Sequence, residues 1–179
     1  MTHAAPRRAH LARHIFALLI CIPLANCIES ARPILTDAQP LLGEQLRLQL
    51  YALRDGAAHE PEAAAFVWRD ARYVRLGSDT NGIGDFTLHA FEGADLIVQS
   101  LRPGLPAEYA IARKLADGTY LLVAIDEDDA DEKTRTNFCG HEGGAACRVA
   151  TREAVLAFAR ATAAEPHSTG GLAVLIADR

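Results

Sequence analysis

Motifs for nucleophilic catalysis and phosphate binding are missing from this chain of 179 residues. Serine is scarce after Ser30 and no Gly-x-Ser-x-Gly sequence occurs, so nothing supports a serine-hydrolase triad. No glycine-rich phosphate loop precedes a helix pattern. Basic residues are few as well: the formal net charge is −5 and no basic stripe runs along the chain. That charge balance argues against nucleic acid as a partner.

Hydrophobic runs long enough to span a membrane are also lacking. The apolar run from Ile15 to Pro23 has about ten residues, whereas a transmembrane helix needs about 20. Arg7, Arg8 and Arg13 precede this run, and no acidic residue precedes Glu29. A basic start followed by a short apolar run and small residues is the layout of a secretory signal peptide.

The segment ends in Leu24-Ala25-Asn26-Cys27, which resembles the lipobox of small bacterial lipoproteins. Asn26 stands where that family usually has Gly, Ala or Ser. The resemblance covers residues 7–28 and implies that Cys27 is lipidated and becomes the first residue of the mature chain. Because Ile28 is not the Asp that tends to retain such proteins at the inner membrane, it implies an outer-membrane anchor facing the periplasm. A soluble periplasmic or secreted protein is the open alternative.

These features divide the chain into three parts. Residues 1–26 are the signal peptide, residues 27–43 the lipidated N-terminus and tether, and residues 44–179 a single β-rich globular domain. Removing residues 1–26 takes away three Arg and no acidic residue, which moves the net charge from −5 to −8. Charge would not hold so acidic a domain to anionic lipid, so acyl chains would supply the membrane attachment.

The four cysteines have separate assignments. Cys21 lies in the signal peptide and Cys27 is the lipid acceptor, which leaves Cys139 and Cys147, eight positions apart. The flexible, glycine-containing sequence between them can close on itself, and an exported protein meets oxidising conditions, so the sequence predicts a disulfide. A metal or redox thiol pair is the alternative, but it usually has closer Cys-x-x-Cys spacing.

Alternation of polar and apolar residues predicts short strands at intervals of about ten residues. The predicted strands cover residues 46–52, 65–68, 73–76, 86–90, 95–101, 109–113 and 119–125. Asp117-Gly118 is a strong hairpin signal between the last two. The pattern indicates an antiparallel β meander that forms a sheet, a sandwich or an open barrel.

One helix is expected near the end of the chain. Thr151 can cap it, and residues 154–164 are rich in helix formers, with Val155 and Phe158 on one face. Residues 172–176 then form a final apolar strand. The predicted fold class is α+β, mainly an antiparallel β meander with this C-terminal helix packed on it.

Two acidic segments could bind calcium, but each has a plainer interpretation. The run 126–132 offers carboxylate oxygens, yet no glycine supplies the sharp turn of a calcium loop, so a solvated loop is favoured. The run 79–85 begins like a calcium loop, but Ile83 occupies a ligand position. Asn81-Gly82 is a typical turn dipeptide, and a turn is therefore the preferred interpretation. No metal ligand and no cofactor is predicted.

Histidines and aromatic residues are the remaining candidates for a functional site. His141-Glu142 lacks the second histidine of a zinc-protease motif. His89 lies in a strand pattern, where a packed histidine is favoured. Phe66 and Trp68 share one strand face and could line a ligand surface, although filling a small β core is the favoured role.

No catalytic residue is assigned by the sequence. The leading hypothesis is therefore a lipid-anchored, non-enzymatic envelope protein, with a membrane attachment through Cys27 and a protein or small-ligand partner in the envelope. It would act by binding or by supporting envelope structure. The alternative is a secreted periplasmic enzyme whose site is assembled from separated loops.

Overall fold

Strands account for most of the regular structure. The computed structural model describes residues 27–54, 57–58, 60–77, 84–140, 146–165 and 170–176. Its strands are β1 (Glu29–Ser30), β2 (Gln45–Arg54), β3 (Ala57–Ala58), β4 (Glu62–Arg69), β5 (Arg72–Leu76), β6 (Asp85–Ala90), β7 (Leu96–Leu101), β8 (Ala107–Ala116), β9 (Thr119–Ala124) and β10 (Gly170–Ile176). Its helices are α1 (Glu132–Phe138) and α2 (Arg152–Ala164).

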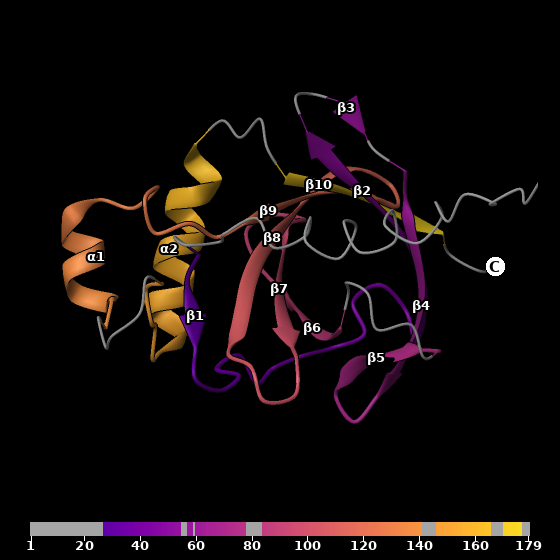
Figure 1. Ribbon diagram of the computed structural model, residues 1–179, viewed down its shortest axis with the longest axis horizontal. Coiled ribbons are helices and arrows are strands. Elements are labelled where there is room, and N and C mark those ends of the chain that lie inside the picture. The colour runs from indigo at the N-terminus through magenta and orange to yellow at the C-terminus, as the bar shows by residue number, and fades with distance from the viewer. Residues whose placement is uncertain are drawn as a thin grey trace, which may run out of the picture.

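Eight of these strands close into a ring. From β2 to β9 each long strand pairs antiparallel with the next long strand along the chain, and β10 pairs with both β9 and β2. The ring order is therefore β8–β7–β6–β5–β4–β2–β10–β9 and back to β8. The α+β class and the antiparallel meander are confirmed, and the architecture is a closed barrel with both helices on one side (Figure 1).

Two hydrophobic cores lie on opposite faces of the barrel wall. The inner core is a group of buried side chains from β2 and β4–β9, among them Phe66, Phe86 and Tyr120. The outer core lies between the wall and the helices, and it joins Ile97 and Ile111 of the wall to other buried residues. Because successive residues of a strand point to opposite faces, one strand supplies both cores.

Helix α2 covers the outer face as the sequence predicts. The Thr151 side chain caps it by accepting a hydrogen bond from the Ala154 N–H at 3.2 Å. Val155, Phe158 and Ala159 are fully buried against the wall, at i, i+3 and i+4 spacing. Burial of this apolar face, rather than the propensity of the segment, holds the helix in place.

A second helix, α1, begins at the end of the acidic run 126–132, where no helix was expected. Its N-cap is Asp131, whose Oδ1 accepts a hydrogen bond from the Thr134 N–H at 2.7 Å. The sequence interpretation of one helix is therefore corrected to two. None of the residues of α1 is buried, so no apolar stripe marked it in the sequence. No described helix is long and apolar enough to cross a membrane.

Residues 27–43 differ from the expected tether, because they pack on the barrel. Ile28 is 0% exposed and Leu35 is 3% exposed, and both belong to the outer core. Glu29–Ser30 forms β1 beside β8. The segment lacks periodicity because most of it is irregular backbone, yet single apolar residues along it are buried.

Candidate functional site

The strand register identifies the inward face of the barrel, which we call the lumen. Cross-strand neighbours share a face of the sheet, and alternate residues along a strand point the same way. Leu46 lies opposite Phe66, and Phe66 lies opposite Arg75. Farther round the ring, Leu88 lies opposite Val98, which lies opposite Ala110. All of these residues therefore face the lumen.

The lumen has a packed half and an accessible half. The packed half consists of buried side chains: Leu46, Phe66, Tyr73, Phe86, Leu88, Leu96, Ala112 and Tyr120. The accessible half includes seven partly buried apolar side chains, Leu48, Leu50, Ala64, Val98, Ala110, Leu122 and Ala124, and the partly buried polar residues Ser100 and Glu108 share its face. An eight-stranded barrel is wide enough to hold its own side chains or one small ligand. Here the accessible half of the wall is mainly apolar and is reached by solvent.

Aromatic rings fill the packed half. The Phe66 and Phe86 rings meet edge to face with centroids 5.0 Å apart, and Tyr73 stacks on Phe86 at 5.1 Å. The Tyr73 hydroxyl donates to Gly43 O at 2.9 Å and accepts from the Leu42 N–H at 3.2 Å. The core interpretation is confirmed for these three rings. Trp68, which contacts Tyr73, is only partly buried.

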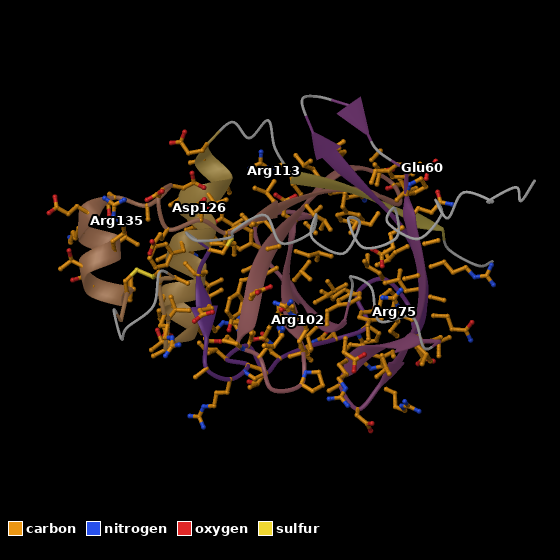
Figure 2. All side chains as sticks on the ribbon, viewed as in Figure 1. Glu60, Arg75, Arg102, Arg113, Asp126 and Arg135 are labelled. Carbon is orange, nitrogen blue, oxygen red and sulfur yellow. A yellow bond between two sulfur atoms is a disulfide. The ribbon has the colours of Figure 1, made fainter. Side chains whose placement is uncertain are left out.

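An ion pair stands on the wall of the accessible half. Glu62 lies opposite Leu50 and Arg75 lies opposite Phe66, so both charged side chains face inward. Arg75 Nη2 is 3.4 Å from Glu62 Oε1, and the two side chains are 12% and 26% exposed. Figure 2 labels Arg75 beside β4 and β5. The Arg75 backbone N–H donates to Asp85 Oδ1 at 3.1 Å, which holds this position of β5 against β6.

On the outer face, a hydroxyl, a histidine and a carboxylate are hydrogen-bonded in the same order as in a hydrolase triad. Thr87 Oγ1 lies 2.8 Å from His89 Nε2, and His89 Nδ1 lies 3.0 Å from Asp37 Oδ1. A carboxylate only accepts hydrogen bonds, so His89 carries its proton on Nδ1 and accepts from Thr87 through Nε2. Asp37 Oδ2 also pairs with Arg152 of α2 at 2.7 Å.

These linked side chains form a structural clamp between the barrel wall, Asp37 and α2. Thr87 is 5% exposed and His89 is 2% exposed, so a substrate cannot reach the hydroxyl. Gln99 Nε2 also donates to Thr87 Oγ1 at 3.0 Å. Burial lowers the pKa of His89 even though Asp37 opposes that shift. The expectation of a packed histidine is confirmed, and the clamp joins α2, residue 37 and the barrel.

A shallow groove of about 280 Å³ lies where β6, β7 and β8 meet Pro33. Its lining includes Arg72 and Arg102. Arg72 lies 3.5 Å from Asp85, and Arg102 pairs with Glu108. Since each cation has an acidic partner, the groove presents no surplus charge to a ligand.

Cys27 lies at the edge of the barrel. It pairs with Asp126 in an antiparallel bridge, and Ile28 N–H donates to Ile125 O at 3.1 Å. The Cys27 side chain is 6% exposed and is not in a disulfide. Burial, with smaller contributions from Asp126 and Glu108, raises the pKa of the Cys27 thiol to about 12. Asp126 follows Ala124 on the same strand face, so Cys27 lies on the face that continues the lumen wall.

The predicted disulfide between Cys139 and Cys147 is present, with the two Cα atoms 5.0 Å apart. Glu127 Oε2 lies 3.7 Å from Cys139 Sγ, and these three residues are the only described group with metal-ligand atoms in mutual reach. Sulfur atoms joined in a disulfide are not thiolate ligands. The group therefore offers a metal no adequate set of donors.

The acidic run 126–132 uses several carboxylates within the fold. Asp126 Oδ1 accepts from the Asp128 N–H at 2.9 Å, Asp131 caps α1, and Asp128 lies 3.8 Å from Arg135 (Figure 2). The interpretation as a solvated loop is corrected to a turn and a helix start. Candidate residues 79–83 and His141-Glu142 lie outside the described residues.

Sequence reasoning missed the pairing of Glu62 with Arg75. The alternation in Ala64, Phe66 and Trp68 was the available signal, because Glu62 continues the same face of that strand. It could not show that the ring closes and turns this face inward. No protein-family model, no curated protein and no solved structure matches this chain.

Proposed function

We propose that this chain is a lipid-anchored envelope protein, attached at Cys27 to the outer membrane and facing the periplasm, whose barrel binds an apolar ligand. The observation that carries the binding role is the accessible half of the lumen. Seven apolar side chains face inward there and remain partly exposed to solvent. Apolar walls with a small number of polar groups are typical of ligand sites.

Binding is favoured over catalysis by the distribution of titratable groups. Among the described strand residues that face the lumen, Glu62 pairs with Arg75 and Glu108 pairs with Arg102, and none is a histidine. The histidine with a hydroxyl and a carboxylate partner is buried on the other face of the wall. General acid–base chemistry needs such groups within reach of a substrate.

The anchor rests on the resemblance to a lipobox, which ends at Cys27. Because Ile28 is in the outer core, no free linker separates residue 27 from the barrel. Lipid on Cys27 would therefore hold the barrel directly at the membrane surface. Cys27 is 6% exposed, so a lipid on its Sγ would require this residue to turn out of its packed position.

Tryptophan fluorescence tests the ligand role, because Trp68 is the single tryptophan and borders the lumen. Titration of the purified protein with a neutral alkyl probe, 1-dodecanol, should change Trp68 emission and saturate. Leu50→Asp should abolish the response, whereas Gln49→Asp, on the opposite face of β2, should preserve it. Val98→Phe, which fills the lumen without adding charge, should also weaken binding. A titration that never saturates would refute the ligand role.

Cell fractionation tests the anchor. Cys27→Ser should move the exported protein from the membrane to the soluble fraction, and the intact mass of the natural protein should correspond to an acylated chain beginning at Cys27. Ala25→Ser is the control, because it keeps Cys27. A mature chain that starts elsewhere and carries no acyl group would contradict the anchor.

A further inference from the structure

We infer that the Glu62–Arg75 ion pair recognises the head group of an amphiphile that carries both an anion and a cation. This inference rests on the proposed ligand role of the lumen and names the class of ligand. The apolar side chains of the accessible half would contact the alkyl chain. Arg75 would bind the anionic group, and Glu62 would bind the ammonium group.

The position of the pair supports this assignment. Glu62 is on β4 at the level of Leu50, and Ala64 lies between it and the packed half of the lumen. The two side chains are mostly buried, yet both border the part of the wall that solvent reaches. Polar groups placed at one end of an apolar site fix the orientation of a ligand. An alkyl chain along Leu48 and Leu50 would bring its head group to this pair.

The geometry of the pair allows the charged groups of a ligand to replace Glu62 and Arg75 as each other's partners. Arg75 Nη2 and Glu62 Oε1 are 3.4 Å apart, at the long end of a hydrogen bond. A phosphate can instead form two parallel hydrogen bonds with a guanidinium group, which are shorter and stronger. Separating Arg75 from Glu62 for an anion alone would leave a largely buried carboxylate without this partner, which is costly.

A zwitterionic head group removes that cost. Its anion replaces Glu62 at Arg75, and its ammonium replaces Arg75 at Glu62, so both protein charges stay compensated. A purely anionic or purely cationic amphiphile compensates only one of them. The pair should therefore select against single charges as well as select for the zwitterion.

Four dodecyl probes, each below its micelle-forming concentration, separate these possibilities. They are dodecyl phosphoethanolamine, dodecanoate, dodecylammonium and the neutral 1-dodecanol, and binding is read from Trp68 emission in the full protein. We expect the zwitterion to bind about tenfold more tightly than either singly charged probe. Equal affinity for the three charged probes would overturn the inference.

Single substitutions test the two roles separately. Glu62→Gln should shift the preference toward dodecanoate, and Arg75→Gln should shift it toward dodecylammonium. Arg72→Gln is the matched control: Arg72 is on β5 as well, but it lies opposite Arg69 on the outer face. It should leave the order of the four affinities unchanged. Circular dichroism and thermal melting of each variant check that the fold is kept.

The outcomes distinguish the two proposals. If 1-dodecanol binds but the substitutions weaken all probes alike, the head-group inference is wrong and the ligand role stands. If none of the four probes binds to the folded protein, both proposals are wrong. Opposite shifts in Glu62→Gln and Arg75→Gln would support the inference, because a merely structural ion pair would not produce them.

Discussion

Gln99 and Leu35 exchange two hydrogen bonds across the outer face of the barrel. The Leu35 N–H donates to Gln99 Oε1 at 3.0 Å, and Gln99 Nε2 donates to Leu35 O at 3.1 Å. Gln99 Oε1 also accepts from the Ile34 N–H at 2.9 Å. A side-chain amide thus takes the place of a strand partner for the irregular segment before β2, and Gln99 itself is 0% exposed.

Gln99→Met should destabilise the protein by about 3 kcal/mol, because it keeps the side-chain volume but leaves buried backbone groups at residues 34 and 35 without partners. Urea denaturation followed by circular dichroism measures this. Gln45→Met, at an exposed position of β2, is the control and should cost little. Equal stability of the two variants would contradict the role assigned to Gln99.

The His89 clamp predicts that stability falls in acid. Because burial lowers the pKa of His89 in the folded state below 6.5, the unfolded chain binds the proton more readily. The free energy of unfolding should therefore decrease as the pH falls below about 6.5. A further loss should follow below 3.8, because Arg152 and His89 lower the pKa of Asp37.

Comparison with His89→Gln isolates this effect. The variant should be less stable at pH 8 and should show a weaker change in stability between pH 7 and pH 5 than the natural protein. Urea titrations at several pH values give both numbers. Parallel pH profiles for the two proteins would exclude His89 as the source.

Removing the disulfide should lower stability by about 2–3 kcal/mol, the value expected for so short a loop. The double variant Cys139→Ser/Cys147→Ser provides the measurement, compared with the oxidised protein. The loss of stability should include local opening of β1, because Cys147 O accepts a hydrogen bond from the Glu29 N–H at 2.9 Å. Hydrogen exchange at Glu29 reports that local effect, and unchanged protection there would contradict it.

Cys27 should be unreactive in the folded chain when it carries no lipid. With a thiol pKa of about 12, only about one molecule in ten thousand is thiolate at pH 8. A mature-length chain produced without acylation should react slowly with an aromatic disulfide reagent when folded and release one equivalent when unfolded. The protein purified from membranes should release none, and one equivalent there would contradict the lipid anchor.

The strands and α2 could be predicted because their side-chain alternation and caps are local. Closure of the barrel could not, since it depends on β10 inserting between β9 and β2, two strands far apart in the sequence. Alternation places Leu48 and Leu50 on one face, but only closure makes that face a lumen. Helix α1 escaped prediction because all its residues except Phe138 are polar and none is fully buried.

The candidate site was harder to predict than the fold. The sequence pattern assigns no role to Glu62, which precedes the predicted strand 65–68, or to Arg75, which lies within the predicted strand 73–76. Their approach to 3.4 Å depends on the β4–β5 register and on Ala64, whose small side chain leaves the space between them. Cys27 was predicted as a lipid acceptor on a tether, and nothing in the sequence showed that Ile28 would be buried.

The placement of β10 sets the order of assembly. Until residues 170–176 have paired as β10, β9 and β2 each present an unpaired edge, and such edges invite pairing with other chains. A chain acylated at Cys27 would already be held at the membrane during that interval. Tethering would keep neighbouring copies at one surface while both edges are exposed, so pairing of β10 with its own barrel would have to outrun pairing between neighbouring chains.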